Sequence, residues 1–182
     1  MKSLTSPENF LVFDLTKLGT AYQIINSFAD DENIHVFEIS PIGSQSVLIL
    51  MSKDLILLQL VHNQSLSLYK SEILSSAIVE NIDGKILDPY LSQQNAKLKS
   101  NLLVFETNTF TSAFVKAKQL TDSDLVIIDF RAIRTSPPNL IIVATSDSIE
   151  KLNVFMNQNS NIKMTVIPKV ESPLKSYFEI LC

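Results

Sequence analysis

The chain has 182 residues, 46% hydrophobic and 19% charged, so it can bury a sizeable core and does not have the composition of a disordered chain. Its formal net charge is −4 and its Lys and Arg are scattered, so we expect neither nucleic acid nor an anionic membrane surface as a partner. The one cysteine, Cys182, excludes an internal disulfide and a cysteine metal cage, and the three glycines leave no glycine-rich phosphate loop. This cysteine usage, and a start without a signal-like apolar stretch, are typical of a cytoplasmic protein.

The first half alternates strand-like and helix-like segments. Residues 10–15 are β-branched, aliphatic and aromatic, which is typical of a strand. Residues 18–28 carry apolar side chains at helical spacing, which predicts an amphipathic helix with one buried face. In chain order we predict strand 10–15, helix 18–28, strands 34–39 and 47–51, a helix starting near Ser52 and Asp54, strand 76–79 and a short helix 86–91.

The second half repeats this order. Phe10-Leu11-Val12-Phe13-Asp14-Leu15 matches Leu102-Leu103-Val104-Phe105-Glu106-Thr107, and a helical stretch follows each. In chain order we predict strand 102–107, helix 110–120, strands 125–130 and 140–144, a helix starting near Ser146 and Asp147, strand 163–167 and a helix 174–181 after Pro173.

Each half therefore reads β-α-β-β-α-β plus a terminal helix, which is the ferredoxin-like arrangement. The predicted fold class is α/β (α+β), with two tandem ferredoxin-like domains whose antiparallel sheets carry helices packed on one face. We expect a first domain at 1–94, a polar linker at 95–100 and a second domain at 101–182, with the two units side by side.

Short motifs stand at matching places in this duplicated frame. They are Val104-Phe105-Glu106-Thr107 in an opening strand, Ile42-Gly43-Ser44 between the second and third strands, and Val166-Ile167-Pro168-Lys169 after a fourth strand, with the weaker run Ile78-Val79-Glu80-Asn81-Ile82 in the first half. Together they resemble the tandem-domain form of the bacterial microcompartment (BMC) shell protein family, of which this chain would be a divergent member.

The resemblance implies a structural protein rather than an enzyme. Three chains would form a homotrimeric, pseudohexameric disc with a central pore for metabolites, and such discs, with other shell proteins, would tile into a microcompartment shell in the cytoplasm. The pore would be lined by two loops, Pro41, Ile42, Gly43, Ser44 and Gln45 in the first half and Ile133, Arg134, Thr135, Ser136 and Pro137 in the second. No catalytic residue, metal site or cofactor is expected, since neither loop holds a cysteine for an iron–sulfur cluster and no nucleophile with an orienting acid surrounds His35 or His62.

The chain departs from the family at the predicted edges of the disc. Asp30 and Asp122 occupy the positions where the family usually has an edge lysine, whereas Lys169 stands where an edge arginine is usual. An anion in place of a cation would make an unchanged partner edge repulsive, so these residues argue against flat tiling but not against the fold.

Arg134 has two interpretations. In a trimeric pore, three copies would form a positive ring that favours anionic metabolites, because the adjoining loop has no acid. Alternatively, Arg134 is an exposed loop arginine without a task.

Two other function classes stay open. The aspartates at the predicted edges favour a BMC-like trimeric scaffold outside a shell. Tandem ferredoxin-like units also serve as small-molecule-binding regulatory domains, since fold alone does not fix function. The sequence does not identify a compartment, a cargo pathway or a pore substrate.

Overall fold

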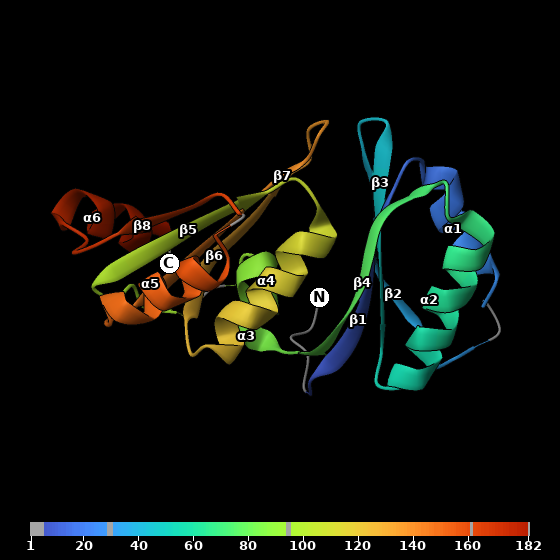
Figure 1. The fold of residues 1–182 in the computed structure, drawn as a ribbon, viewed down its shortest axis with the longest axis horizontal. Coiled ribbons are helices and arrows are strands. Elements are labelled where there is room, and N and C mark those ends of the chain that lie inside the picture. Colours follow the sequence, from blue (N-terminus) through green and yellow to red (C-terminus); the bar gives the residue numbers. More distant parts are fainter. Residues whose placement is uncertain (1–5, 29–30, 94–95, 161, 182) are drawn as a thin grey trace.

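In the computed structural model, which describes residues 6–28, 31–93, 96–160 and 162–181, two α+β units lie side by side (Figure 1). The first unit contains β1 (Glu8–Leu15), α1 (Leu18–Asn26), β2 (His35–Ile42), β3 (Gln45–Ser52), α2 (Leu55–Tyr69), β4 (Ile73–Ile82) and α3 (Gly84–Tyr90). The second contains β5 (Asn101–Thr107), α4 (Phe110–Asp122), β6 (Val126–Ile133), β7 (Asn139–Ser146), α5 (Ile149–Gln158), β8 (Met164–Ile167) and α6 (Ser172–Leu181). The predicted fold class and element order are confirmed.

Each unit forms one four-stranded antiparallel sheet with the same strand order. The first sheet runs β2-β3-β1-β4 and the second runs β6-β7-β5-β8. The edge strand of each sheet has a register shift at a matching place, between Val36 and Glu38 in β2 and between Ile127 and Asp129 in β6. The two sheets therefore repeat each other in topology and in a local irregularity.

The first sheet is buried on both faces. Phe10, Leu11, Val12 and Phe13 are consecutive in β1 and each is 0% exposed, which is the continuous apolar run expected of a strand covered on two sides. Leu11 and Phe13 pack in a cluster with α1 and α2, whereas Phe10 and Val12 pack with the second unit. Figure 1 shows α3 and α4 between the two sheets and α1 and α2 on the far side of the first sheet.

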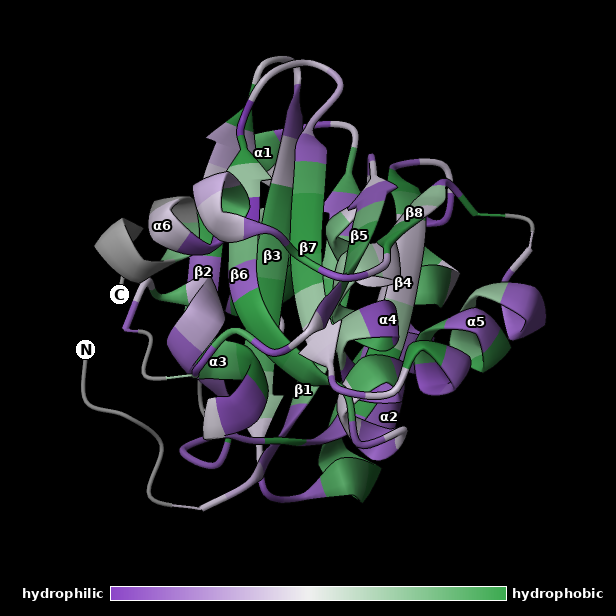
Figure 2. Cartoon of the chain, turned by 90° about the vertical axis from the view of Figure 1, so that its left-hand side faces the viewer, coloured by the Kyte–Doolittle hydropathy of each residue, from purple (hydrophilic) through white to green (hydrophobic). Residues whose placement is uncertain are grey.

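The second sheet carries α4 and α5 on one face and α6 on the other. Leu103 and Phe105 of β5 lie in the large cluster that also contains residues of α4 and α5. Leu102 lies on the opposite face and packs in a smaller cluster with Val170 and Phe178. The predicted one-face packing thus holds for the two main helices of each unit, while the terminal helices α3 and α6 lie elsewhere. Figure 2 shows the apolar character of β3 and β7, the second strand of each sheet.

An asparagine at the first strand of each unit ties three segments together. The side chain of Asn9 donates to the carbonyl of Lys53 and accepts from the backbone N–H of Asn81, both at 3.1 Å. Asn101 donates to the carbonyl of Asp147 and accepts from the N–H of Lys169 at the same distances. Asn81 and Lys169 both have positive φ, 53°. The repeat therefore extends to individual hydrogen bonds.

Helix starts agree with the sequence in part. Asp54 caps α2 by accepting from the N–H of Leu57, as expected. The cap of α5 is Ser148 rather than the predicted Asp147, because Ser146 accepts the N–H of Ser148 and turns the chain one residue later. Within the described ranges, no helix combines the length and apolarity needed to cross a membrane.

Candidate functional site at the junction of the two units

The two predicted pore loops meet in the structure. One connects β2 to β3 and the other connects β6 to β7, and Figure 1 shows both hairpins projecting at the same end of the molecule, next to each other. Gly43 has φ +58°, and a Cβ atom built on it would lie 2.5 Å from Cβ of Ser136. Only a residue without a side chain allows this approach, so glycine at 43 is required both for its backbone conformation and for the contact between loops.

Most residues of the two loops face solvent. In the first loop Pro41, Gly43 and Ser44 are exposed and Gln45 is half-buried, and in the second loop Ile133, Arg134, Thr135, Ser136 and Pro137 are exposed. Ile42 differs from the others, because its side chain is 2% exposed and belongs to the large core cluster. The Ile42 side chain therefore anchors the hairpin, and only its backbone could line an opening.

Below the loops, Arg134 forms an ion pair that the sequence did not predict. Its guanidinium donates to Oε1 of Glu38 at 2.5 Å, and the hydroxyl of Ser40 donates to the same oxygen at 2.9 Å. The hydroxyl of Tyr90, at the end of α3, donates to Oε2 of Glu38. The prediction of an uncompensated positive charge at Arg134 is wrong, because Glu38 of strand β2 neutralises it, although the adjoining loop holds no acid.

The protonation states of this cluster follow from burial and charge. Burial, followed by the negative charge of Glu38, raises the pKa of Tyr90 far above its ordinary value, so the phenol stays a hydrogen-bond donor. Burial lowers the pKa of Arg134, but the hydrogen bond and charge of Glu38 outweigh it and raise the pKa overall. In the Glu38–Arg134–Tyr90 cluster, the phenol of Tyr90 is therefore neutral and the other two side chains form an ion pair. The cluster joins β2, α3 and the second loop.

Asp14 joins the two units at the start of α4. Its carboxylate accepts the backbone N–H groups of Phe110 at 2.8 Å and Thr111 at 2.9 Å, and the hydroxyl of Ser75 at 2.7 Å. Thr109, the residue that precedes the helix, accepts the N–H of Ser112. The first turn of a helix has N–H groups without intrahelical partners and a partial positive charge, so a carboxylate from the other unit is well placed there.

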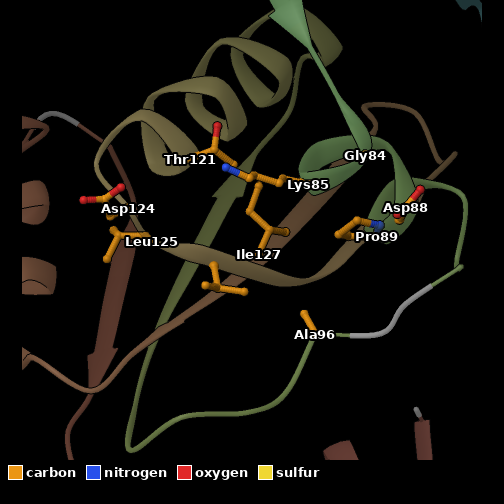
Figure 3. A pocket seen from close by; sticks show the side chains of 10 residues that line it. Gly84, Lys85, Asp88, Pro89, Ala96, Thr121, Asp124, Leu125 and Ile127 are labelled. Carbon is orange, nitrogen blue, oxygen red and sulfur yellow. The ribbon is translucent and has the colours of Figure 1, made fainter. Parts of the chain in front are cut away.

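A cavity of about 360 Å³ lies at the other side of the junction, and Figure 3 shows it from close by. It lies between α3, the segment that follows α3, and the turn from α4 into β6. Its lining combines the apolar side chains of Leu125 and Ile127 with the charged groups of Lys85, Asp88 and Asp124. Its size and mixed lining suit a small polar molecule.

The predicted edge residues occupy separate places. Asp122 lies at the end of α4, with its side chain 59% exposed and paired with Lys118 one turn earlier. Lys169 is exposed in the loop after β8, with its backbone fixed by Asn101. Asp30 lies outside the described residues.

The histidines show no catalytic arrangement among the described residues. Nε2 of His62 lies 2.8 Å from the hydroxyl of Ser76, and its ring packs near Phe13. Burial lowers the pKa of His62. No described group of three or more His, Cys, Asp or Glu residues has the arrangement of a metal site.

Sequence reasoning missed the residues that join the units. Asp14 matches Glu106 in the repeat, and Glu38 matches Asp129. The repeat alone accounts for an acidic residue at each position, so the sequence did not indicate a contact between the units. Tyr90 lies at the end of a short helix, where nothing in the sequence indicates that it reaches Glu38. Their roles arise from contacts between segments 52 or more residues apart.

These observations define the class of this chain as a tandem α+β protein whose equivalent hairpin loops meet at the junction of its two units. No family model matches the chain, and no curated protein matches it in sequence. Among solved structures, it is similar to a microcompartment protein from Desulfitobacterium hafniense DCB, with a TM-score of 0.73 at 13% identity, over 93% of this chain and 99% of that chain.

The chain therefore has the fold of a microcompartment protein, and the resemblance to BMC shell proteins is confirmed at the level of the fold. Two other structures are named for a glycine cleavage system transcriptional repressor and a chlorite dismutase, each at 10% identity. They cover 90% and 98% of this chain and 98% and 100% of their own chains. Their TM-scores of 0.32 and 0.33 are too low to indicate a shared fold.

Proposed function

We propose that this chain is a non-enzymatic shell component of a bacterial microcompartment, which assembles as a homotrimeric, pseudohexameric disc with a central pore for small metabolites. The observation that carries the proposal is the meeting of the two hairpin loops at Gly43 and Ser136, in a chain that has the fold of a microcompartment protein along nearly its whole length. In a ring of such chains, equivalent loops would alternate around one axis.

The chemistry of the proposed pore follows from the loop residues. Three of their exposed side chains, Ser44, Thr135 and Ser136, are small and polar. The other exposed loop side chains are apolar, such as Ile133, except for that of Arg134, whose charge is balanced by Glu38. Such a pore would select metabolites mainly by size and hydrogen bonding rather than by net charge. Because Arg134 is paired, the proposed pore has no preference for anionic metabolites.

The test is the assembly state of the overproduced protein. Mass measurement by light scattering should give a trimer, and electron microscopy should show discs that associate into sheets, tubes or closed shells. Trimeric discs that never associate would support the scaffold alternative instead, and a monomer at every concentration would contradict both.

Two observations favour the alternatives. The exposed Asp122 at a predicted disc edge favours a trimeric scaffold outside a shell, because its pairing with Lys118 leaves no free positive charge there to attract a facing edge. The cavity lined by Lys85, Asp88 and Asp124 favours a small-molecule-binding regulatory role. A shift in melting temperature with an amino acid or a nucleotide, without higher assembly, would support the regulatory role.

A further inference from the structure

The contact between the two units is a complete interface within one chain. Helix α4 of the second unit packs against the first sheet, where Phe114 is 0% exposed and its ring lies 5.8 Å from Phe10. Asp14 of the first sheet accepts the N–H groups of Phe110 and Thr111 at the start of the same helix. Apolar packing along α4 and a carboxylate at its first turn thus hold the units together.

Helix α1 has the same sequence position in the first unit, but its equivalent surface is bare. An offset of 92 residues, which aligns Phe10 with Leu102, also aligns Tyr22 with Phe114, and Tyr22 is 57% exposed. On the neighbouring edge strand, Val36 is 42% exposed whereas its counterpart Ile127 is 2% exposed. The first unit therefore presents to solvent the surface that the second unit buries.

The first turn of α1 also has no cap. Lys17, which corresponds to the capping Thr109, makes no side-chain cap, and the described hydrogen bonds give the N–H groups of Leu18 and Gly19 no acceptor. Glu72 lies beside this turn, where it pairs with Lys17 at 2.7 Å and accepts the hydroxyl of Thr20, but it takes neither backbone donor. The space beside Gly19 is open, since an added Cβ would meet nothing within 4 Å.

The complementary carboxylate stands on the second unit. Glu106 occupies in β5 the position that Asp14 occupies in β1. Each carboxylate also accepts a hydrogen bond from the last strand region of its own unit. Ser75 of β4 donates to Asp14, and Lys163, directly before β8, donates to Oε2 of Glu106 at 2.6 Å. Among the described contacts, Oε1 of Glu106 has no partner, whereas both carboxylate oxygens of Asp14 accept N–H groups of α4.

We propose that Glu106 of one chain accepts the N–H groups of Leu18 and Gly19 at the start of α1 in a second copy, with Tyr22 of that copy packed as Phe114 is packed within the chain. The inference rests on the proposed trimer and assigns its contact between chains. Because each copy offers α1 on one unit and Glu106 on the other, the contact is head-to-tail, and such contacts close into rings when the rotation permits.

The occupant is a second copy because the chain itself contains the matching surfaces. The positive end of α1 and the carboxylate of Glu106 are complementary in charge. On the outer face of the second sheet, Val104 is only half-buried, whereas its counterpart Val12 is 0% exposed under α4. That face can therefore accept further apolar cover, as the equivalent face of the first sheet does.

The experiment measures the trimer dissociation constant of the full chain by analytical ultracentrifugation, for the wild type and for Glu106→Gln, Tyr22→Ser and Leu60→Ser. Leu60 is the matched control, since it is 61% exposed on α2, and the equivalent helix α5 packs mainly against the strands of its own unit. We expect Glu106→Gln to weaken association about tenfold per contact, because Gln lacks the charge, and Tyr22→Ser about tenfold to a hundredfold. Leu60→Ser should leave it unchanged.

The outcomes separate this inference from the proposed function. Each of these side chains is exposed or half-buried in the single chain, so circular dichroism and melting temperature of dilute samples should show intact folds for all variants. If the wild type is a trimer and both interface variants dissociate as the wild type does, the assigned contact is refuted while the trimer stands. If the wild type is a monomer at every concentration, the proposed function and the contact both fail.

Discussion

Replacing Asp14 by Ala tests whether one carboxylate holds the two units together. Asp14 is 6% exposed and accepts three hydrogen bonds, two of them from the N–H groups of Phe110 and Thr111 in the other unit. A hydrogen bond to a charged group contributes about 1.5–3 kcal/mol, and a buried donor left without an acceptor carries the full cost of its lost hydration. The hydroxyl of Ser75 is half-buried and can turn to water, so we count the two backbone bonds alone.

The expected loss in the free energy of unfolding is about 3–5 kcal/mol, which corresponds to a fall in melting temperature of roughly 8–15 °C for a chain of this size. Urea denaturation followed by circular dichroism measures it. Thr109→Ala is the matched control, because it removes an ordinary cap from the same helix and should cost about 1 kcal/mol. A loss below about 1 kcal/mol for Asp14→Ala, or one no larger than that of Thr109→Ala, would refute the reasoning.

Three further changes probe the loops and the cluster. Gly43→Ala should destabilise the protein by about 1–3 kcal/mol, because the added Cβ would meet Ser136 and the φ of residue 43 is positive. Adding Ser136→Gly to the same chain should restore part of this loss in urea denaturation. A double variant no more stable than Gly43→Ala alone would contradict the contact between the loops. Burial lowers the pKa of His62 below 6.5, so its neutral form contributes stability that is complete above pH 6.5 and falls as the pH drops below it. The melting temperature of the wild type should therefore decrease more steeply below pH 6.5 than that of His62→Gln, and parallel curves would argue against this. Glu38→Gln should leave the charge of Arg134 unbalanced. Sulfate stabilises folded proteins in general, so it should raise the melting temperature of both proteins, but more in the variant; an equal rise in both would contradict the pairing.

Local patterns were sufficient to predict the elements and the duplication. The apolar run at the start of each half predicted β1 and β5, and helical spacing predicted α1 and α4, because both signals depend only on neighbouring residues. The meeting of the loops could be inferred only through the resemblance to a family. The pairing of Glu38 with Arg134 could not, because the two residues are 96 positions apart and their approach depends on how α4 packs on the first sheet.

The equivalent halves also differ in ways that the sequence pattern conceals. Tyr22 and Phe114 are similar residues at matching positions, and hydropathy alone gives both the buried face of a helix. Only the order of the halves along the chain decides that α4 also packs against the sheet of the other unit, whereas α1 packs against its own sheet alone. Periodicity thus predicts which side chains can be buried, whereas connectivity decides which of them are.

The largest core cluster draws its members from both halves, from Phe10 and Val12 in the first sheet to Phe114 and Phe130 in the second unit. Separating the halves would open the Phe10 face of the first sheet to water, while the cluster of Leu11 and Phe13 under α1 and α2 would stay covered. The shared cluster therefore couples the stability of each half to the presence of the other. A chain built in this way supplies its two unlike halves in strict one-to-one proportion, so mutations can make one half different from the other while any assembly still receives both in equal number.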